Sequence, residues 1–288
     1  MKQRIVTGTV FTLAVLAFLI PGFFQPLLLC FAMSSIALVG AVELMNAVRE
    51  RDLTPGRPVP YLCMAITLVP VVFSFFAESL LSVFAVFSVT ILFLSVLSVI
   101  LVVVFHKKDG AFPDGIAAAA ILLYISFPIS CANFLLLFVR NGWYFFVLGL
   151  FSPWISDVFA YFTGVFCGRH KIVPRISPKK TWEGCIGGAI SCSLLTMLYF
   201  DLAVMPLFPE LKNDAVVFAF SAGLGLLLSV VSQLGDWLAS SVKRWAGIKD
   251  FGKILPGHGG ILDRFDSALF TLPVTFAITL LFFLEGRI

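Results

Sequence analysis

The sequence predicts an all-α, polytopic integral membrane protein of about nine transmembrane helices, with the N-terminus in the cytoplasm and the C-terminus outside. Hydrophobic residues make up 60% of the 288 residues, and only 12% are charged. That is about half the charged fraction of a typical soluble domain. Apolar runs of about 20 residues, long enough to cross the hydrocarbon core of a bilayer, recur along the chain. A large soluble helical core is the alternative, but this composition is typical of a chain solvated by lipid.

Nine apolar runs carry this prediction, and breaks or charged segments separate them. Pro21-Gly22 ends the first run, residues 49–52 (RERD) follow the second and residues 106–109 (HKKD) follow the fourth. The first run resembles a signal peptide, but it lacks a persuasive small-residue cleavage site and leads directly into the second run. We therefore interpret it as a retained span. The predicted spans cover about residues 5–20, 24–47, 60–77, 80–105, 115–139, 143–166, 183–206, 215–235 and 263–284.

The distribution of basic residues supports this span count and orientation. Cytoplasmic segments of membrane proteins carry an excess of Lys and Arg. With the N-terminus inside, only Arg140, Lys212 and Arg287 among the 20 basic residues fall in outside segments. Adding or removing one span would mix the two groups. This topology places two polar regions, 167–182 and 236–262, on the cytoplasmic side.

The later spans carry regular stripes of small residues, which favour close helix packing in membranes. Gly184, Gly188 and Cys192 recur at every fourth residue of the seventh span, and Ser221, Gly225 and Ser229 do so in the eighth. The early spans are rich in Leu, Val and Phe. We therefore expect residues 141–288 to form a catalytic region and residues 1–140 to flank it. The six cysteines show no CxxC pairing and are interpreted as packing residues.

The polar residues are concentrated in the segment 235–267, where an isolated charged group would be costly unless it is paired, hydrated or bound to an ion. If residues 235–246 are helical, Asp236, Ser240, Lys243 and Arg244 lie on one face. A solvated amphipathic helix on the membrane surface would show the same pattern. The carboxylate, the hydroxyl and the two cations on one stripe also suit a phosphate site.

The next residues, 249–260, predict an irregular loop that leads into a helix. Four glycines and a proline indicate irregular backbone whose amides are free to face anions. Asp263 and Asp266 follow at a spacing that places them on one helix face, beside Arg264. Acidic residues at a helix start are favourable for electrostatic reasons alone. Together with Asp236, however, they suggest a hard divalent cation such as Mg²⁺, because that ion prefers oxygen ligands.

Other ligand and nucleotide motifs are absent from the sequence. The three histidines are dispersed, so a zinc site is not expected. The sequence contains no GxxxxGK[ST] loop, no GxSxG elbow and no GxGxxG motif after a strand. Nothing indicates a nucleic-acid partner. A phosphate enzyme of this kind would be of a membrane-specific type.

A second polar cluster lies at residues 169–184 on the same predicted side. Its stretch SPKKTWEG, residues 177–184, mixes hydroxyl, basic, aromatic and acidic groups. Basic residues next to a span also attract anionic lipid, but that attraction requires only charge. Asp157 lies inside the sixth predicted span and is a functional candidate for that reason. Its other interpretation is a carboxylate satisfied by a neighbouring Arg or Ser.

The segment from Ser240 to Asp266 resembles the signature of the CDP-diacylglycerol synthases, the phosphatidate cytidylyltransferase family. The resemblance rests on the pattern SxVKRxxxxKDxGxxLPxHGGIxDRFD and extends over 27 residues. The Ser156-Asp157 pair and SPKKTWEG look like further blocks of that family in the expected order. The resemblance covers about residues 150–284, whereas the first 140 residues are alike only in being apolar spans. The chain departs from the pattern at residues 165–167 (VFC), where a more basic stretch is expected.

The resemblance implies that CTP and phosphatidate react to give CDP-diacylglycerol and pyrophosphate, with Mg²⁺ as cofactor; a second, monovalent cation is not excluded. Both substrates are anions, so cations are needed to bring them together. The expected partners are CTP, phosphatidate and membrane lipid, and a homodimer is left open. The expected location is a bacterial cytoplasmic (inner) membrane, spanned several times.

The residues to which the resemblance and the local chemistry assign roles fall into three groups. The catalytic group is Asp236, Asp263, Lys243 and Arg264. The metal ligands are Asp236, Asp263 and Asp266. The substrate-binding group is Ser177, Lys179, Lys180, Thr181, Glu183, Ser240, Arg244, Lys249, Asp250, His258, Gly259 and Gly260.

Two other functional classes stay open at this point. A transporter would also place an acidic residue such as Asp157 inside a span. A polyprenol kinase would use CTP as well, but it transfers the γ-phosphate and releases CDP. The leaving group, pyrophosphate or CDP, therefore distinguishes the two enzyme classes. Transfer of label from CTP to lipid distinguishes both enzymes from a transporter.

Replacing Asp263 by Asn is expected to remove nearly all turnover, because a neutral amide lacks the negative charge that binds a cation. CTP-dependent turnover in isolated membranes measures the effect, and membrane fractionation verifies insertion. Lys107→Ala, outside both polar clusters, is the control and should change little. Activity of Asp263→Asn within a few-fold of the parent would contradict the assignment.

Overall fold

The computed structural model describes residues 2–76, 79–105, 111–208 and 215–284. Lys107 and three of the other counted basic residues, Lys108, Lys212 and Arg287, lie outside these ranges. The described chain divides into two compact units. Unit 1 contains the residues up to Phe138 together with Lys243–Phe265, and unit 2 contains Val139–Val242 together with the residues from Asp266 on. The segment with most of the signature thus packs with the N-terminal half of the chain.

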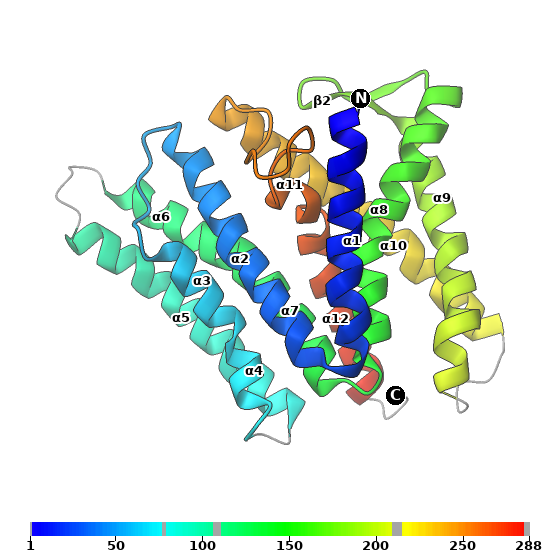
Figure 1. Ribbon diagram of the computed structural model, residues 1–288, viewed down its shortest axis with the longest axis horizontal. Coiled ribbons are helices and arrows are strands. Elements are labelled where there is room, and N and C mark those ends of the chain that lie inside the picture. The colour runs from blue at the N-terminus through cyan, green and yellow to red at the C-terminus, as the bar shows by residue number, and fades with distance from the viewer. Residues whose placement is uncertain (1, 77–78, 106–110, 209–214, 285–288) are drawn as a thin grey trace. The chain divides into compact units, whose positions relative to one another are not determined.

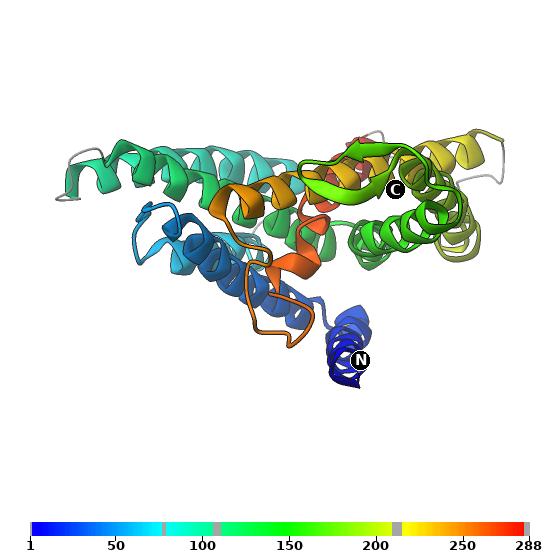
Figure 2. The same ribbon diagram turned by 90° about the horizontal axis from the view of Figure 1, so that it is seen from above.

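Unit 1 is built from helices around α2. Its helical segments in chain order are α1 (Lys2–Phe24), α2 (Pro26–Arg49), α3 (Val59–Thr67), α4 (Val69–Phe73), α5 (Leu80–Phe105), α6 (Phe112–Ile121), the π-helical segment η1 (Leu122–Ser126), α7 (Phe127–Phe138) and α11 (Leu262–Phe265). Helix α2 packs against α1, α3, α7 and α11. Figures 1 and 2 show the loop before α11, coloured orange, beside the C-terminal half of α2.

A buried polar contact fixes the interior of unit 1. Asn133 on α7 is fully buried, and its amide Nδ2 donates to the Thr67 carbonyl oxygen at 2.7 Å. Thr67 is the last residue of α3, so this bond joins two helices that lie far apart in sequence. The bond satisfies the Asn133 NH₂ group inside the apolar bundle with a neighbouring backbone carbonyl.

Unit 2 contains four long helices and one hairpin. Its elements are α8 (Gly142–Cys167), β1 (Lys171–Val173), β2 (Ser177–Thr181), α9 (Trp182–Tyr199), η2 (Phe200–Val204), η3 (Met205–Leu207), α10 (Ala215–Ala246) and α12 (Ala268–Leu284). The last four residues of α10 belong to unit 1. Strands β1 and β2 pair antiparallel, with Lys171 opposite Thr181 and Val173 opposite Ser177. Helix α8 packs against both α9 and α12.

The predicted small-residue stripes lie where helices of unit 2 approach closely. A Cβ atom on Gly188 of α9 would lie 2.7 Å from the Ser156 carbonyl oxygen of α8. A Cβ atom on Gly225 of α10 would lie 2.7 Å from the Ser193 Cα of α9. In the same interior, the hydroxyls of Ser156 and Ser229 are 2.6 Å apart. The stripes therefore do allow the close packing that the sequence predicted.

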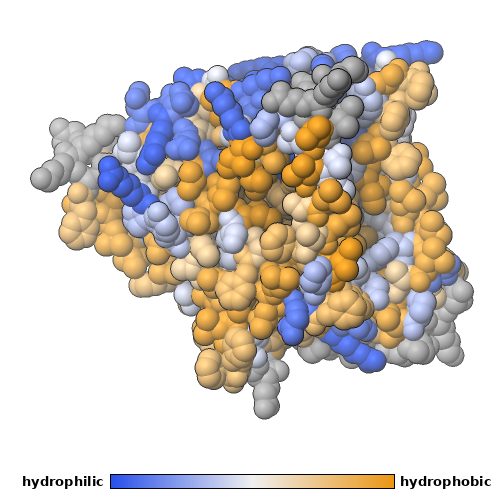
Figure 3. All heavy atoms as spheres, viewed as in Figure 1, coloured by the Kyte–Doolittle hydropathy of each residue, from blue (hydrophilic) through white to orange (hydrophobic). Residues whose placement is uncertain are grey.

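The all-α, polytopic membrane class is confirmed. Seven helical stretches of the described chain are long and apolar enough to cross a membrane, and two shorter apolar helices, Val59–Phe73 and Ala268–Leu281, lie at the third and ninth predicted spans. Over α1 and α2 the surface is mainly hydrophobic, and hydrophilic residues gather at the C-terminal end of α2 (Figure 3). The exact span count and the sides of the two termini stay predictions.

Three local features differ from the sequence prediction. The segment 167–182 is not simply a loop, since it contains the hairpin of β1 and β2. The eighth span does not end near residue 235 but continues as one helix to Ala246, so the stripe from Asp236 to Arg244 is helical as assumed. The helix predicted from Asp263 ends at Phe265, and Asp266 lies in the turn before α12. The placement of Asp263 and Asp266 on one helix face was therefore wrong.

Gly225→Ala is expected to lower the thermal stability of the detergent-solubilised protein, because the new Cβ would press on the α9 backbone. Such overpacking costs about 1–3 kcal/mol. Gly223→Ala on the same helix is the matched control, since nothing lies within 4 Å of its added Cβ. Alanine gains helix propensity at both positions, by about 1 kcal/mol. A melting temperature of Gly225→Ala equal to or above that of Gly223→Ala would refute the close packing.

Candidate functional site

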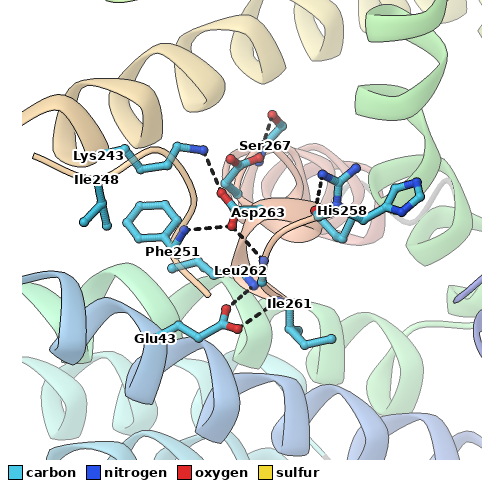
Figure 4. A network of polar contacts seen from close by, with 12 residues as sticks. Glu43, Lys243, Ile248, Phe251, His258, Ile261, Leu262, Asp263 and Ser267 are labelled. Carbon is cyan, nitrogen blue, oxygen red and sulfur yellow. Dashed lines mark hydrogen bonds and ion pairs between the residues drawn. The ribbon is translucent and has the colours of Figure 1, made fainter. Parts of the chain in front are cut away.

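In unit 1 the candidate site is organised around the carboxylate of Asp263, at the start of α11. Its Oδ1 accepts a bond of 2.8 Å from the Lys243 ammonium. Its Oδ2 accepts from the backbone N–H of Phe251 at 2.8 Å and from that of Gly260 at 2.9 Å. The Asp263 side chain is only 4% exposed. Figure 4 shows these bonds meeting on one side chain, which joins the end of α10, the middle of the loop and its last turn.

The loop between α10 and α11 depends on glycine at two of its turns. Gly257 and Gly259 have φ angles of 78° and 87°, in the left-handed region that other residues rarely adopt. The turn that they form is closed by Leu255, whose N–H donates to the Gly259 carbonyl at 2.9 Å and whose carbonyl accepts from the His258 N–H at 2.8 Å. The predicted irregular backbone is confirmed, and it is an ordered turn.

This loop encloses a cleft of about 510 Å³ within unit 1. Three cationic side chains and one carboxylate line it, so its formal charge is positive. The Arg264 guanidinium is held at its edge by a bond of 2.7 Å from Nη2 to the His258 carbonyl. The lining residues are Lys249, Asp250, Gly252, Lys253, Leu255, Pro256, Gly257, His258, Gly259 and Arg264. A glycine-lined, cationic cleft of this kind suits a phosphate-bearing ligand.

Two residues of α2 and its C-terminal turn, which the sequence analysis did not select, bind this loop. The Glu43 carboxylate accepts from the backbone N–H of Ile261 at 3.1 Å and from that of Leu262 at 2.8 Å. The Arg51 Nε donates to the Trp245 carbonyl, at the end of α10. An acidic residue inside an apolar span is a functional candidate by default. That criterion was applied to Asp157, and it would also have identified Glu43.

In unit 2 the second predicted cluster lies against Asp236. The Lys180 ammonium forms an ion pair with the Asp236 carboxylate, and each side chain is about one quarter exposed. Thr181 begins α9 with a side-chain cap, since its Oγ1 accepts from the Gly184 N–H at 3.2 Å. Of the residues predicted to serve one site, the structure brings the side chains of Lys180 and Asp236 together.

Glu183 holds the base of the hairpin rather than pointing to the Lys180 pair. It accepts from the backbone N–H of Arg169 at 3.1 Å, and its Oε1 lies 2.6 Å from the His170 Nδ1. Ser177 is half-buried and Lys179 is exposed in strand β2. Glu183 thus fixes where the hairpin starts, while Lys180 at the end of β2 turns to Asp236.

The remaining predicted residues differ in exposure and in their contacts. Asp157 on α8 is exposed, and both it and Lys180 lie close enough to the Cys185 thiol to act on it electrostatically. Asp266 is buried, and its Oδ1 accepts from the Ser267 N–H at 2.7 Å. Ser240 is half-buried, whereas Arg244, Lys249 and Asp250 are exposed.

The proposed metal ligands belong to different parts of the fold. Asp263 lies in unit 1, and Asp236 and Asp266 lie in unit 2. Within the described ranges, no three His, Cys, Asp or Glu side chains are grouped as a complete protein metal site. The sequence prediction that Asp236 and Asp263 meet around one cation stays a prediction.

Comparisons with known proteins agree with the sequence resemblance. The model of a family described as "Cytidylyltransferase family" matches residues 2–282. A phosphatidate cytidylyltransferase of Bacillus subtilis is 32% identical over 286 residues, which is 98% of both chains. One from Staphylococcus aureus is 34% identical over 277 residues, 95% of this chain and 97% of the relative. One from Thermotoga maritima is 32% identical over 280 residues, 96% of both.

Proposed function

We propose that this chain, which belongs to the cytidylyltransferase family, transfers the cytidylyl group of CTP to phosphatidate in phospholipid biosynthesis. An oxygen of the phosphatidate phosphate attacks the α-phosphorus of CTP. The bond from that phosphorus to the bridging oxygen of the β-phosphate breaks, and pyrophosphate leaves with the bond's electrons. The relatives named phosphatidate cytidylyltransferase support this reaction, since each aligns with nearly the whole chain.

The observation that carries the proposal is the cationic cleft of the glycine loop. Lys249, Lys253 and Arg264 face a volume of about 510 Å³, which is in the range of small-molecule sites. The attacking and leaving groups are all anionic phosphates, so fixed positive charge lowers the barrier to their approach. Phosphatidate is an anion at neutral pH, and the reaction therefore needs no strong general base.

Cationic side chains and the glycine backbone have separate proposed roles in binding the phosphates. Lys243 and Arg264 neutralise phosphate charge, and the backbone of Gly259 and Gly260 lets phosphates approach closely. The Lys243 ammonium is already placed by Asp263 and by the Phe251 ring, whose centroid lies 5.1 Å away. In unit 2, Lys180 is assigned to phosphate binding by the family resemblance, and its ammonium forms an ion pair with Asp236.

Mg²⁺ is proposed as the cofactor, with Asp236 and Asp263 as its carboxylate ligands. The donors suit the ion, because Mg²⁺ binds through one or two carboxylates together with water and substrate phosphates. A full cage of protein ligands is not required. The Asp263 carboxylate accepts three hydrogen bonds, two of them at Oδ2, and its Oδ1 has a second lone pair for a cation. When bound, Mg²⁺ supplies charge neutralisation between the two substrates.

The proposed location is the cytoplasmic face of the inner membrane. The segments 167–182 and 236–262 are rich in Lys and Arg, which favours the cytoplasmic side. Phosphatidate would present its phosphate there from the leaflet, and CTP would arrive from the cytoplasm. A homodimer stays a prediction.

The product assay tests the function directly. Purified protein with phosphatidate vesicles, Mg²⁺ and CTP labelled in the cytosine ring is expected to form labelled lipid and free pyrophosphate in equal amounts. A CTP-dependent lipid kinase would release labelled CDP and leave the lipid without label. A transporter would give neither product. Chelation by EDTA is expected to stop the reaction and added Mg²⁺ to restore it; full activity in EDTA would refute the metal proposal.

Lys180→Ala is expected to reduce kcat/KM by about 100-fold or more, on the scale of a lost charge-stabilising contact. Arg175→Ala is the matched control, because this basic side chain has no assigned role and is exposed in the turn of the same hairpin. We expect it to reduce kcat/KM by no more than about threefold, as befits an exposed charge. Initial rates at varied CTP and phosphatidate measure both. Equal losses in the two variants would show that the pairing with Asp236 carries no specific role.

A further inference from the structure

Glu43 is a buried carboxylate in the middle of unit 1. It is 4% exposed on α2, a 24-residue helix in which an 18-residue window has a mean hydropathy of 2.2. Taking such a group out of water is costly unless the protein satisfies it. Its predicted span gave it no role, and neither polar cluster contains it. An explanation for Glu43 must therefore come from what its carboxylate binds.

The carboxylate is satisfied by the backbone of the signature loop. Each oxygen accepts one amide proton: Oε1 accepts from Ile261 and Oε2 from Leu262. Hydrogen bonds to an ionised acceptor are stronger than neutral ones, and two parallel bonds also fix orientation. Figure 4 shows Glu43 reaching from α2 to these two residues, on the opposite side of the loop from Lys243.

The loop residues next to the Glu43 carboxylate include two glycines, which have no side chain. A Cβ atom on Gly260 would lie 2.5 Å from both Glu43 oxygens, and one on Gly252 would collide with Oε1. Gly252 lies in the first half of the loop and Gly260 in its last turn. These glycines therefore leave the space that the carboxylate fills, and Glu43 lies against both halves of the loop.

Glu43 and Asp263 bind consecutive amides of the same turn. The N–H of Gly260 donates to Asp263, and those of Ile261 and Leu262 donate to Glu43. Asp263 also binds the Phe251 N–H, next to Gly252. Two carboxylates thus determine the path of the backbone that lines the cleft. One of them comes from the loop's own chain segment and the other from α2.

We infer that Glu43 is a positioning residue for the cleft: it fixes the turn at 260–262 and the facing Gly252, and so sets where the cationic loop side chains meet the CTP phosphates. This inference rests on the proposed function for the identity of the ligand. Glu43 is not among the residues that line the cleft. Helix α2 therefore contributes to nucleotide affinity from outside the signature.

The kinetic test compares Glu43→Gln with Asp114→Asn in the full-length protein. Gln offers one acceptor oxygen, so one of the two backbone N–H groups would face an NH₂ donor. Asp114 is the matched control, because it is also buried in a helix of unit 1 and accepts from the Thr54 N–H at 2.9 Å. Glu43→Gln is expected to raise KM for CTP by about tenfold and to change KM for phosphatidate by less than about twofold. Asp114→Asn should leave both constants within about twofold, because it removes a bond outside the loop.

A purely structural role would give a different result. Loss of folded enzyme lowers the apparent kcat and leaves both KM values unchanged, and that outcome for Glu43→Gln overturns the inference. Glu43→Asp retains both acceptor oxygens and the charge, although its reach is shorter. It is expected to recover part of the CTP affinity lost in Glu43→Gln. If Glu43→Gln fails to fold, KM of Glu43→Asp for CTP decides: a raised value supports the inference and an unchanged value overturns it.

Amide hydrogen exchange separates this inference from the proposed function. In the protein without substrates, the fragment 252–262 is expected to exchange about tenfold faster in Glu43→Gln and at the parental rate in Asp114→Asn. Unchanged exchange in Glu43→Gln overturns the positioning role. If the parent protein makes no CDP-diacylglycerol, the proposed function fails. The exchange result then still decides whether Glu43 holds the loop.

Discussion

The structure of the candidate site depends on the need to satisfy buried carboxylates in a chain that is mostly apolar. Asp263 and Glu43 are both almost inaccessible to water, and an unpaired charge there would be strongly destabilising. Their partners are one ammonium and four backbone amides, all in unit 1. The loop between α10 and α11 therefore has a fixed path although it contains little regular structure. The cleft follows from that path, since the same backbone that binds the carboxylates on one side lines the cleft on the other.

Membrane solvation explains why the polar groups are gathered in this way. Large hydrophobic side chains are exposed on many of the long helices, as expected where lipid is the solvent. Backbone amides that are not in helices must then be satisfied inside the protein or at its polar edge. In unit 1 carboxylates accept them, and in unit 2 Glu183 does so at the base of the hairpin. In both clusters, acidic side chains accept hydrogen bonds from the backbone of short irregular segments.

The long periodic features of this fold could be predicted from the sequence, whereas contacts between distant segments could not. All nine apolar runs correspond to helical segments, because hydrophobic length is a local signal. The ion pair of Lys180 with Asp236 joins residues of the two predicted polar segments, whereas a single site formed by both segments stays a prediction. The break after Phe265 was missed, since Asp-Ser in a helical pattern is only a weak stop signal. Glu43 was missed because its partners are backbone amides more than 200 residues away. Almost every residue has such an amide, so the residue type does not identify the partner. Only its charge within an apolar run was visible.

A loop held by carboxylates and glycines has a consequence for catalysis. If apolar side chains had fixed the turn, their Cβ atoms would occupy the space that the glycines leave open near Glu43 and Asp263. Hydrogen bonds to the backbone instead fix the chain without filling the cleft. Donors and cations that are already oriented need not reorganise when charge develops on the transferred phosphate, and preorganisation of this kind is a large part of enzymatic rate acceleration. The N-terminal helices are therefore more than a membrane anchor for the signature. Helix α2 supplies one of the two carboxylates that determine the shape of the cleft, so the site cannot be understood from residues 235–267 alone.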